Sequence, residues 1–161
     1  MLMPYHKLPD DAKVWIYQAD RPIEIDELNF INDLIEAFVE QWQLKTQDIL
    51  GYAAVYYRRF IVIMADVGSI GKEAIEEPIE MIHYIENELG IDFFQDKAIC
   101  YKIGLQDIDS FYLEDIKRLI DNGTLSKETL FFDIQIDKKS DFDKNWGKLR
   151  AIDSVFSKYF R

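Results

Sequence analysis

Two short segments are apolar on both faces of a β-strand, and they constrain the fold more than any other feature of the sequence. In Lys13–Gln18, Val14 and Ile16 lie on one face and aromatic side chains lie on the other. The segment Phe60–Ala65 is apolar throughout. A strand of this kind must be covered on both sides. We therefore expect both segments in a covered sheet, with Lys13–Gln18 as a central strand.

An amphipathic helix is predicted after the first strand. Apolar residues recur at intervals of three and four over residues 28–42, which places them on one side of a helix. Asp26 is the expected N-cap. Combined with the strands and a second helix, this periodicity predicts the main core. Its expected members are Val14, Ile16, Leu28, Ile31, Ile35, Phe38, Ile61, Ile63, Ile79, Ile82 and Leu89.

The second apolar strand is expected to form a hairpin with the segment before it. Tyr52–Tyr57 has the composition of a strand, and Arg58 and Arg59 alone separate it from Phe60–Ala65. A link this short favours an antiparallel pair. A two-residue type I′ turn favours Asn-Gly, so the sequence leaves the turn type open.

A second helix and a further strand complete this part of the chain. Apolar residues recur at helical spacing from Ile75 to Leu89, and Gly90 can end the helix. Pro78 lies inside this pattern, so the regular helix either begins near Glu77 or is kinked there. Lys97–Ile103 is expected to form a strand.

The predicted order is strand, helix, strand, strand, helix, strand, which is the split βαβ, or ferredoxin-like, order. It predicts an α+β fold with an antiparallel sheet and both helices on one of its faces. We expect one domain over residues 1–161. It has an acidic βαββα core at residues 1–96, onto which the strand and extension at residues 97–161 pack.

The C-terminal extension is predicted to be a helix, a strand and a helix. Ser110 can cap the first helix, and apolar and polar residues alternate in Thr129–Ile136 as in a strand. Lys138–Asn145 is expected to be a charged loop. The apolar spacing over residues 149–159 predicts the final helix.

The net charge of −11 comes entirely from residues 1–95, because residues 96–161 hold twelve basic and twelve acidic residues. Strong acidity argues against nucleic acid as a partner. Seven acids and no Lys or Arg lie between residues 73 and 92. This stretch is either a solvated helix face or a docking surface for a basic protein partner, with Glu76, Glu77 and Glu80 as its candidate residues.

Arg58 and Arg59 are two adjacent cations in the acidic part of the chain. They are candidates for binding an anion or a partner's carboxylate. The alternative is that they pair with acids of the chain itself.

The expected location is the cytoplasm. Cys100 is the single cysteine and cannot form an intramolecular disulfide, which fits a reducing compartment. The N-terminus has no apolar signal region, and no apolar stretch is long enough to span a membrane.

Several stretches together resemble a known family, and Val14–Gln18 (Val-Trp-Ile-Tyr-Gln) is the most specific of them. The others are Leu8–Pro22 around it, Phe38–Trp42, Tyr57–Val62, Gly90–Phe94 and Thr129–Asp133. In order and spacing they resemble an uncharacterised bacterial family commonly labelled "ABC transporter ATPase". The family implies no established mechanism. The chain departs from the family's pattern at Gln43–Thr46 and at Gly68–Lys72.

The ATPase label would require a phosphate-binding loop, for which Asp66–Glu73 is the best match. Gly71 and Lys72 fit the motif G-x-x-x-x-G-K-[ST]. Asp66 replaces the first Gly and puts a carboxylate beside the phosphates, and Glu73 lacks the hydroxyl that ligates Mg²⁺. We therefore expect no phosphate-binding loop here. The glycines are expected to allow a tight turn at the start of the following helix.

Other catalytic groups give weaker signals. His83 is expected to be a partly buried structural residue, and Glu80 and Asn87 are the nearest residues that could join it in a metal site. Cys100 is expected to be a buried, inert thiol.

We therefore expect a non-catalytic cytoplasmic interaction or adaptor domain with a protein partner and no cofactor. The alternative is a small-molecule or nucleotide-binding protein, enzymatic or not. Its site would lie near residues 66–72 and use Asp66, Ser69 and Lys72.

Overall fold

The most apolar segment of the chain is the middle strand of the first sheet. The computed structural model describes residues 1–68 and 75–161. β1 (Lys13–Gln18) and β4 (Gly51–Tyr56) pair antiparallel with opposite edges of β5 (Phe60–Ala65). Every residue of β5 is buried. The prediction that β1 is central is wrong, because β1 is an edge strand of this sheet.

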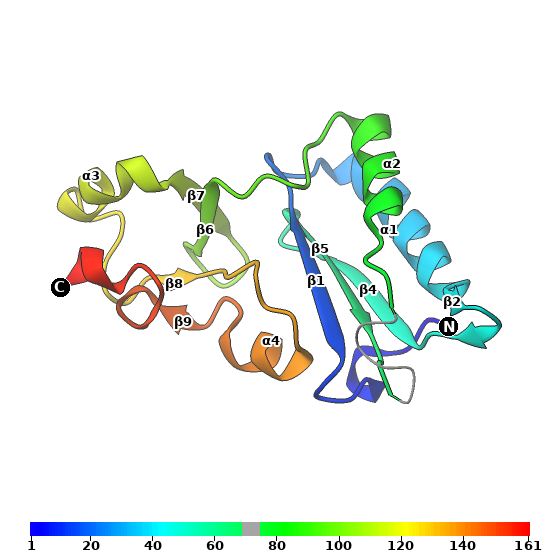
Figure 1. Cartoon of the computed structure of the whole chain (residues 1–161). Coiled ribbons are helices and arrows are strands. Elements are labelled where there is room, and N and C mark those ends of the chain that lie inside the picture. The colour runs from blue at the N-terminus through cyan, green and yellow to red at the C-terminus, as the bar shows by residue number, and fades with distance from the viewer. Residues whose placement is uncertain (69–74) are drawn as a thin grey trace.

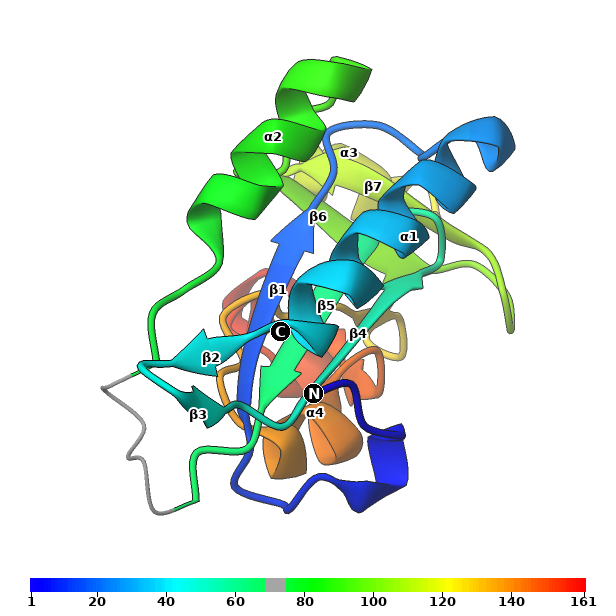
Figure 2. The same cartoon turned by 90° about the vertical axis from the view of Figure 1, so that its right-hand side faces the viewer.

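Both long helices cover the same face of this sheet, as the split βαβ order predicts (Figure 2). α1 (Ile25–Glu40) and α2 (Ile79–Leu89) enclose the first core cluster with the sheet. From the helices it includes Ile31, Ile35, Val39, Ile82 and Ile85, and from the strands Trp15, Tyr17, Ala53, Ile61, Ile63 and Ala65. The side chains at the alternate positions of each strand point away from the helices.

The helix termini agree with the sequence-based expectation except at the start of α1. The N-cap of α1 is Glu24 rather than Asp26, and the Glu27 carboxylate accepts the Glu24 N–H at 2.9 Å, as in a capping box. Pro78 is the N-cap of α2, so the helix begins after the proline and is not kinked by it. Gly90 ends α2 at φ +66°, a conformation that favours glycine.

The other face of the first sheet packs against the C-terminal residues, which form a second lobe (Figure 1). This second cluster joins Val14, Phe60, Val62 and Met64 of the first sheet to Cys100, Phe132, Phe142 and Trp146. The rings of Phe142 and Trp146 stack with centroids 4.6 Å apart. The edge strand β1 is apolar on both faces because each face of the sheet has its own cover.

The strand expected to be the fourth of a ferredoxin-like sheet belongs to a second sheet. β6 (Ala98–Lys102) pairs with β7 (Ile108–Tyr112) and β8 (Leu130–Phe131), and β8 pairs with β9 (Leu149–Arg150). The ferredoxin-like prediction is thus wrong in this strand, although the other three strands and both helices follow it. Within the described ranges, β1 has at its free edge two isolated bridges, Gln18↔Phe94 and Lys13↔Lys138.

Side chains just before β6 explain why pairing with β1 stops. Asp92 accepts the N–H of Phe94, and Gln95 accepts the N–H of Ala98, so the chain turns at this point. Instead of a backbone hydrogen bond between β1 and β6, the side-chain amide of Gln18 donates to the carbonyl of Ala98 at 2.8 Å.

The extension predicted as helix, strand and helix differs in each part. Ser110 lies in β7, and the helix is reduced to a 3₁₀ turn, Leu113–Asp115, followed by α3 (Ile116–Asp121). β8 is short because Asp133 accepts the N–H of Gln135 and bends the chain. The expected charged loop is α4 (Lys139–Asn145).

The expected final helix is not continuous, and the remaining elements are short. Residues 149–160 comprise β9 and two 3₁₀ turns, Ala151–Asp153 and Ser157–Phe160. A 3₁₀ turn, Tyr5–Lys7, precedes β1, and a small hairpin of β2 (Gln43–Leu44) and β3 (Gln47–Asp48) precedes β4. A third cluster around Phe111, Ile116 and Phe131 lies on the outer face of the second sheet.

Most residues of the predicted core are buried or partly buried, but Ile79 is exposed, and Val14 and Ile16 belong to the second cluster rather than to the one under the helices. Ile79, the first residue of α2, is 38% exposed. Ile16, Leu28, Phe38 and Leu89 are partly buried at the edges of the clusters. Among the described residues, no helix is long and apolar enough to cross a membrane.

We predict that Ile35→Ala lowers the free energy of unfolding by about 2–5 kcal/mol, because Ile35 is fully buried between α1 and the sheet and its loss leaves a cavity. Urea denaturation measures the change. Glu36→Ala, at the next and exposed position of the same helix, is the control and should change the free energy by less than about 0.5 kcal/mol. Equal effects of the two variants would contradict the assigned helix face.

We also predict that residues 97–161 expressed alone do not fold cooperatively. The fragment loses the first-sheet half of the second cluster, which includes Phe60, Val62 and Met64, and its own sheet contains two strands of only two residues. Thermal unfolding followed by near-ultraviolet circular dichroism should show no sigmoidal transition. A sharp transition would mean that the second lobe is an independent domain.

Candidate functional site: a basic turn and an apolar groove

The turn between β4 and β5 has an unusual backbone for its sequence. Tyr57 and Arg58 have φ angles of +56° and +52°, and the N–H of Arg59 donates to the carbonyl of Tyr56 at 3.0 Å. Two successive positive φ angles are typical of a type I′ turn, where Asn and Gly are preferred. A residue with a side chain in this region costs on the order of 1 kcal/mol. The turn therefore needs support from its surroundings.

Both arginines of the turn provide that support by bonding to one backbone segment. The carbonyl of Arg58 accepts the N–H of Ile23 at 2.6 Å, and the Arg58 Nε donates back to the carbonyl of Ile23 at 2.7 Å. Arg59 repeats the arrangement with Ala19, at 2.8 and 2.7 Å. Each guanidinium is thus held at its Nε, and the orientation of both is fixed.

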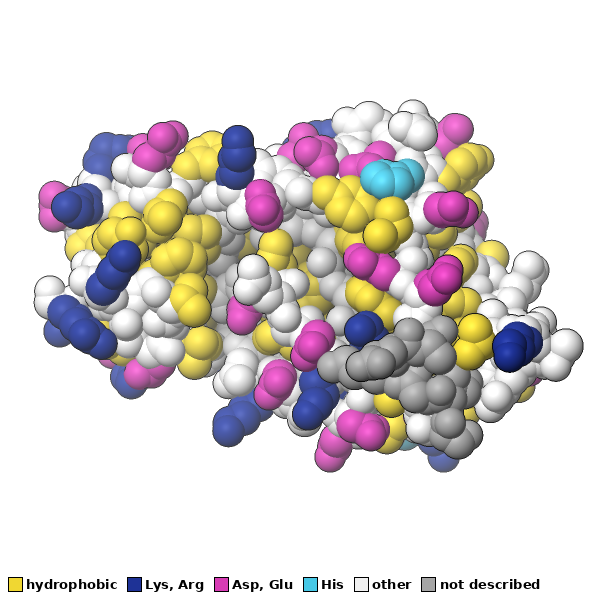
Figure 3. Space-filling view, in the orientation of Figure 1, with side chains coloured by type: hydrophobic (Ala, Val, Ile, Leu, Met, Phe, Trp, Pro, Cys, Tyr) yellow, Lys and Arg dark blue, Asp and Glu magenta, His cyan; other side chains and the backbone are white. Residues whose placement is uncertain are grey.

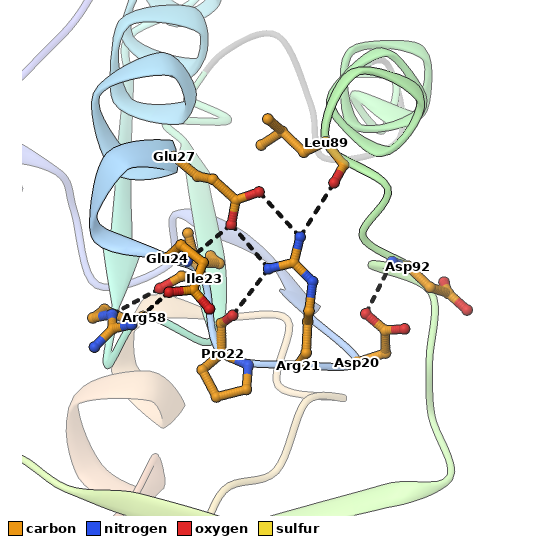
Figure 4. A network of polar contacts seen from close by, with 9 residues as sticks. All are labelled: Asp20, Arg21, Pro22, Ile23, Glu24, Glu27, Arg58, Leu89 and Asp92. Carbon is orange, nitrogen blue, oxygen red and sulfur yellow. Dashed lines mark hydrogen bonds and ion pairs between the residues drawn. The ribbon is translucent and has the colours of Figure 1, made fainter.

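The segment that receives these bonds is itself tied to both helices (Figure 4). Arg21 forms a bidentate pair with Glu27 of α1, at 2.9 and 3.0 Å, and donates to the carbonyl of Leu89 at the end of α2 at 3.2 Å. Asp20 accepts the N–H of Asp92. The hydrogen bond from Arg21 lowers the pKa of Glu27 below its ordinary value.

The two arginines differ in their charge partners. Arg58 is exposed and lies 4.0 Å from Glu24, which is the outer limit of an ion pair. Arg59 is only 7% exposed, and its guanidinium donates to the Ser110 hydroxyl at 3.3 Å. Within residues 1–68 and 75–161, no carboxylate forms an ion pair with Arg59. The expectation that the chain's own acids pair with these cations thus holds for Arg58 alone.

A cavity of about 510 Å³ opens beside this turn, between α1, the turn and the β6–β7 connection. Arg58 and Arg59 line it together with Asn32, Gln106 and one acid, Asp107. The two arginines are predicted from the sequence. Asn32 and Gln106 are not, because they lie in other elements and no local sequence pattern indicates that these elements are close to the turn.

The acidic candidates lie elsewhere, around the start of α2. Glu76, Glu77 and Glu80 are exposed, and Glu77 accepts the hydroxyl of Tyr17 at 2.9 Å. Together with burial, this bond raises the pKa of Tyr17. The structure does not bring these acids together with the two arginines. Their docking role stays a prediction.

The alternative site near residues 66–72 lies mostly outside the described residues, since Ser69 and Lys72 are not among them. Asp66 accepts the N–H of Gly68 at 2.9 Å, which is a local turn contact. The segment Asp66–Glu73 as a phosphate loop is likewise outside the described ranges, apart from its first three residues.

The two other residues with reactive side chains, His83 and Cys100, make only ordinary structural contacts. His83 is exposed rather than partly buried, with its ring against Phe94 and its Nδ1 2.7 Å from Glu86. The described residues contain no group of three potential metal ligands. Cys100 is fully buried, as expected, and burial raises the pKa of its thiol to about 11.

An apolar groove runs along the second lobe, where sequence analysis placed no site. Two hollows of about 690 and 260 Å³ share Asp96, Ile99 and Phe156 in their linings. Hydrophobic side chains gather on this face of the lobe in the space-filling view (Figure 3). Leu113 and Val155 of the lining are 41% and 84% exposed. Leu113 has the spacing of a buried helical residue, but it begins a 3₁₀ turn directly after β7 and is exposed there.

Comparison of the chain with protein-family models, with curated proteins and with solved structures gives no match. The resemblance to the family labelled as a transporter ATPase therefore remains a prediction.

We predict that Glu27→Gln lowers stability at neutral pH by about 0.5–1 kcal/mol, the range of a partly exposed ion pair. Because the folded-state pKa of Glu27 is lowered, its contribution is complete above its unfolded pKa of about 4 and disappears as the pH falls through the folded value. The difference from the wild type, measured by urea denaturation, should therefore vanish in acid. A difference independent of pH would show that the charge is not responsible.

Proposed function

We propose that the protein is a non-catalytic interaction domain of the cytoplasm. In this proposal, the groove of the second lobe binds an apolar segment of a partner protein that carries flanking Lys or Arg residues. The observation that supports it is the groove itself, in which exposed apolar side chains are surrounded by acids.

The apolar part of the groove would provide the affinity. Ile99 and Phe156 line both hollows, and Tyr112, Leu113 and Val155 are exposed around them, with Tyr112 at 48%. Burial of apolar surface stabilises a complex by about 25 cal/mol per Å² before the costs of association are subtracted. Exposed apolar surface gathered around a concave site is typical of an interaction site, whereas single exposed apolar residues are ordinary.

The charge around the groove would select the partner. Asp96, Glu114 and Asp133 lie in the lining, against a single Lys97, and all four are exposed. The excess charge of −11 lies in residues 1–95, while residues 96–161 are neutral overall, so charge selection at the groove rests on these local acids. Complementary charge favours Lys and Arg beside the apolar residues of the bound segment and disfavours acids there.

The exposed acids Glu76 and Glu80 on the helix side belong to the same proposal as a second, weaker contact for a basic partner. They lie in the first lobe, so their contribution can be separated from that of the groove by substitution.

We predict that a labelled amphipathic peptide of Leu and Lys binds saturably in fluorescence anisotropy. A peptide of the same length with Glu in place of Lys should bind at least about tenfold more weakly, because the acids of the groove repel it. Val155→Asp and Leu113→Asp should each weaken the Leu/Lys peptide by a similar factor, since they put a charge into its apolar contact.

Leu105→Asp is the matched control, because Leu105 is 89% exposed and lies outside the linings of both hollows. It should leave the affinity unchanged. Equal affinity for the two peptides would contradict the charge selection, and equal effects of Leu105→Asp and Val155→Asp would contradict the groove as the binding surface.

A further inference from the structure

We propose that the cavity beside the Tyr57–Arg59 turn is a second binding site, and that its ligand is an oxyanion, a carboxylate or phosphate group, received between Arg58 and Arg59. This site is independent of the groove, because it lies at the junction of α1, the β4–β5 turn and the β6–β7 connection.

The first argument is the buried charge of Arg59. A guanidinium remains protonated in proteins, and a buried charge without a counter-charge is costly even when its hydrogen bonds are made. Arg59 has neutral acceptors, the carbonyl of Ala19 and the hydroxyl of Ser110, and no ion-paired carboxylate in the described part of the chain. It also lines the cavity. An anion in the cavity would supply the missing counter-charge.

The second argument is the set of residues around the cavity. The exposed Arg58 lies next to Arg59 in the lining, and Asn32 and Gln106, whose side chains carry amide groups, line the walls formed by other elements. Asp107 is the single acid among these lining residues and forms no ion pair with either arginine in the described ranges. Cations and amide N–H groups together are the donors that carboxylate and phosphate oxygens require.

The third argument is that the donors are held in advance of binding. The Nε atoms of Arg58 and Arg59 are fixed on backbone carbonyls at 2.7 Å, in a turn whose two positive φ angles are costly for residues with side chains. An Asn-Gly turn would form the hairpin without that cost. The arrangement therefore favours a role for the side chains, and prior orientation reduces the entropy lost on binding.

The size of the cavity sets the scale of the ligand. About 510 Å³ lies within the range of small-molecule sites. A phosphorylated small molecule presents a phosphate group to the arginines, whereas a carboxylated small molecule or the C-terminus of a peptide presents a carboxylate. The experiment therefore distinguishes phosphate from carboxylate.

The test uses NMR of the full chain labelled with ¹⁵N, following the Nε–Hε signals of Arg58 and Arg59 at constant ionic strength. The probes are inorganic phosphate, N-acetylalanine and N-acetylalaninamide, each raised to about 20 mM in the presence of salt that screens non-specific attraction. We expect a saturable shift of the Arg59 signal with phosphate or N-acetylalanine and none with the amide. Phosphate alone would identify a phosphorylated small molecule, and N-acetylalanine alone would identify a carboxylate ligand, peptide terminus included.

Arg58→Gln is the informative variant, because Arg58 is exposed and its loss leaves the buried Arg59 in place. It should weaken binding of the active probe about tenfold, the effect of removing one charge-assisted contact. Arg118→Gln, an exposed arginine paired with Asp115 in the second lobe, is the control and should bind as the wild type does. The proposal is overturned if neither anion gives a saturable shift, or if Arg58→Gln and Arg118→Gln bind the probe equally.

Discussion

The burial of both faces of the first sheet is the constraint on which the structure depends. β5 has no exposed residue, so the sheet needs α1 and α2 on one side and the aromatic cluster of the second lobe on the other. Phe60, Val62 and Met64 face that cluster, while Ile61 and Ile63 face the helices. Removing either layer would expose half of the strand to water. The two lobes are therefore joined through a shared core rather than by a surface contact.

The sequence predicted what depends on local periodicity and missed what depends on pairing between distant segments. Both helices on one face, the hairpin and the strand at Lys13–Gln18 follow from spacing alone and are confirmed. The place of β6 could not be predicted, because it depends on which of two sheets offers a partner. Leu113 has helical spacing with Ile116 and Ile120, yet the preceding residues pair with β6 and leave it exposed.

The candidate sites show the same difference between what a local pattern predicts and what depends on distant segments. Arg58 and Arg59 are recognisable in the sequence as adjacent cations, but no sequence pattern indicates that Arg59 is buried or that Ser110 and Asn32 lie near the turn. The groove combines Gln18 with side chains from several segments between residues 95 and 156, and each of them alone resembles an ordinary core or loop residue. A site assembled across a topology has no linear motif, so physical inspection of the fold is needed to find it.

The position of Cys100 gives this chain a built-in chemical reporter. Its sulfur lies fully buried in the shared core between the lobes, and it is the single thiol of the sequence. A thiol-specific reagent can reach it only when the lobes separate or the whole chain unfolds. When labelling is faster than reclosing, its rate under native conditions gives the rate of those opening events without any engineered probe. Comparison of that rate with global unfolding would tell whether the lobes part before the first sheet itself is lost.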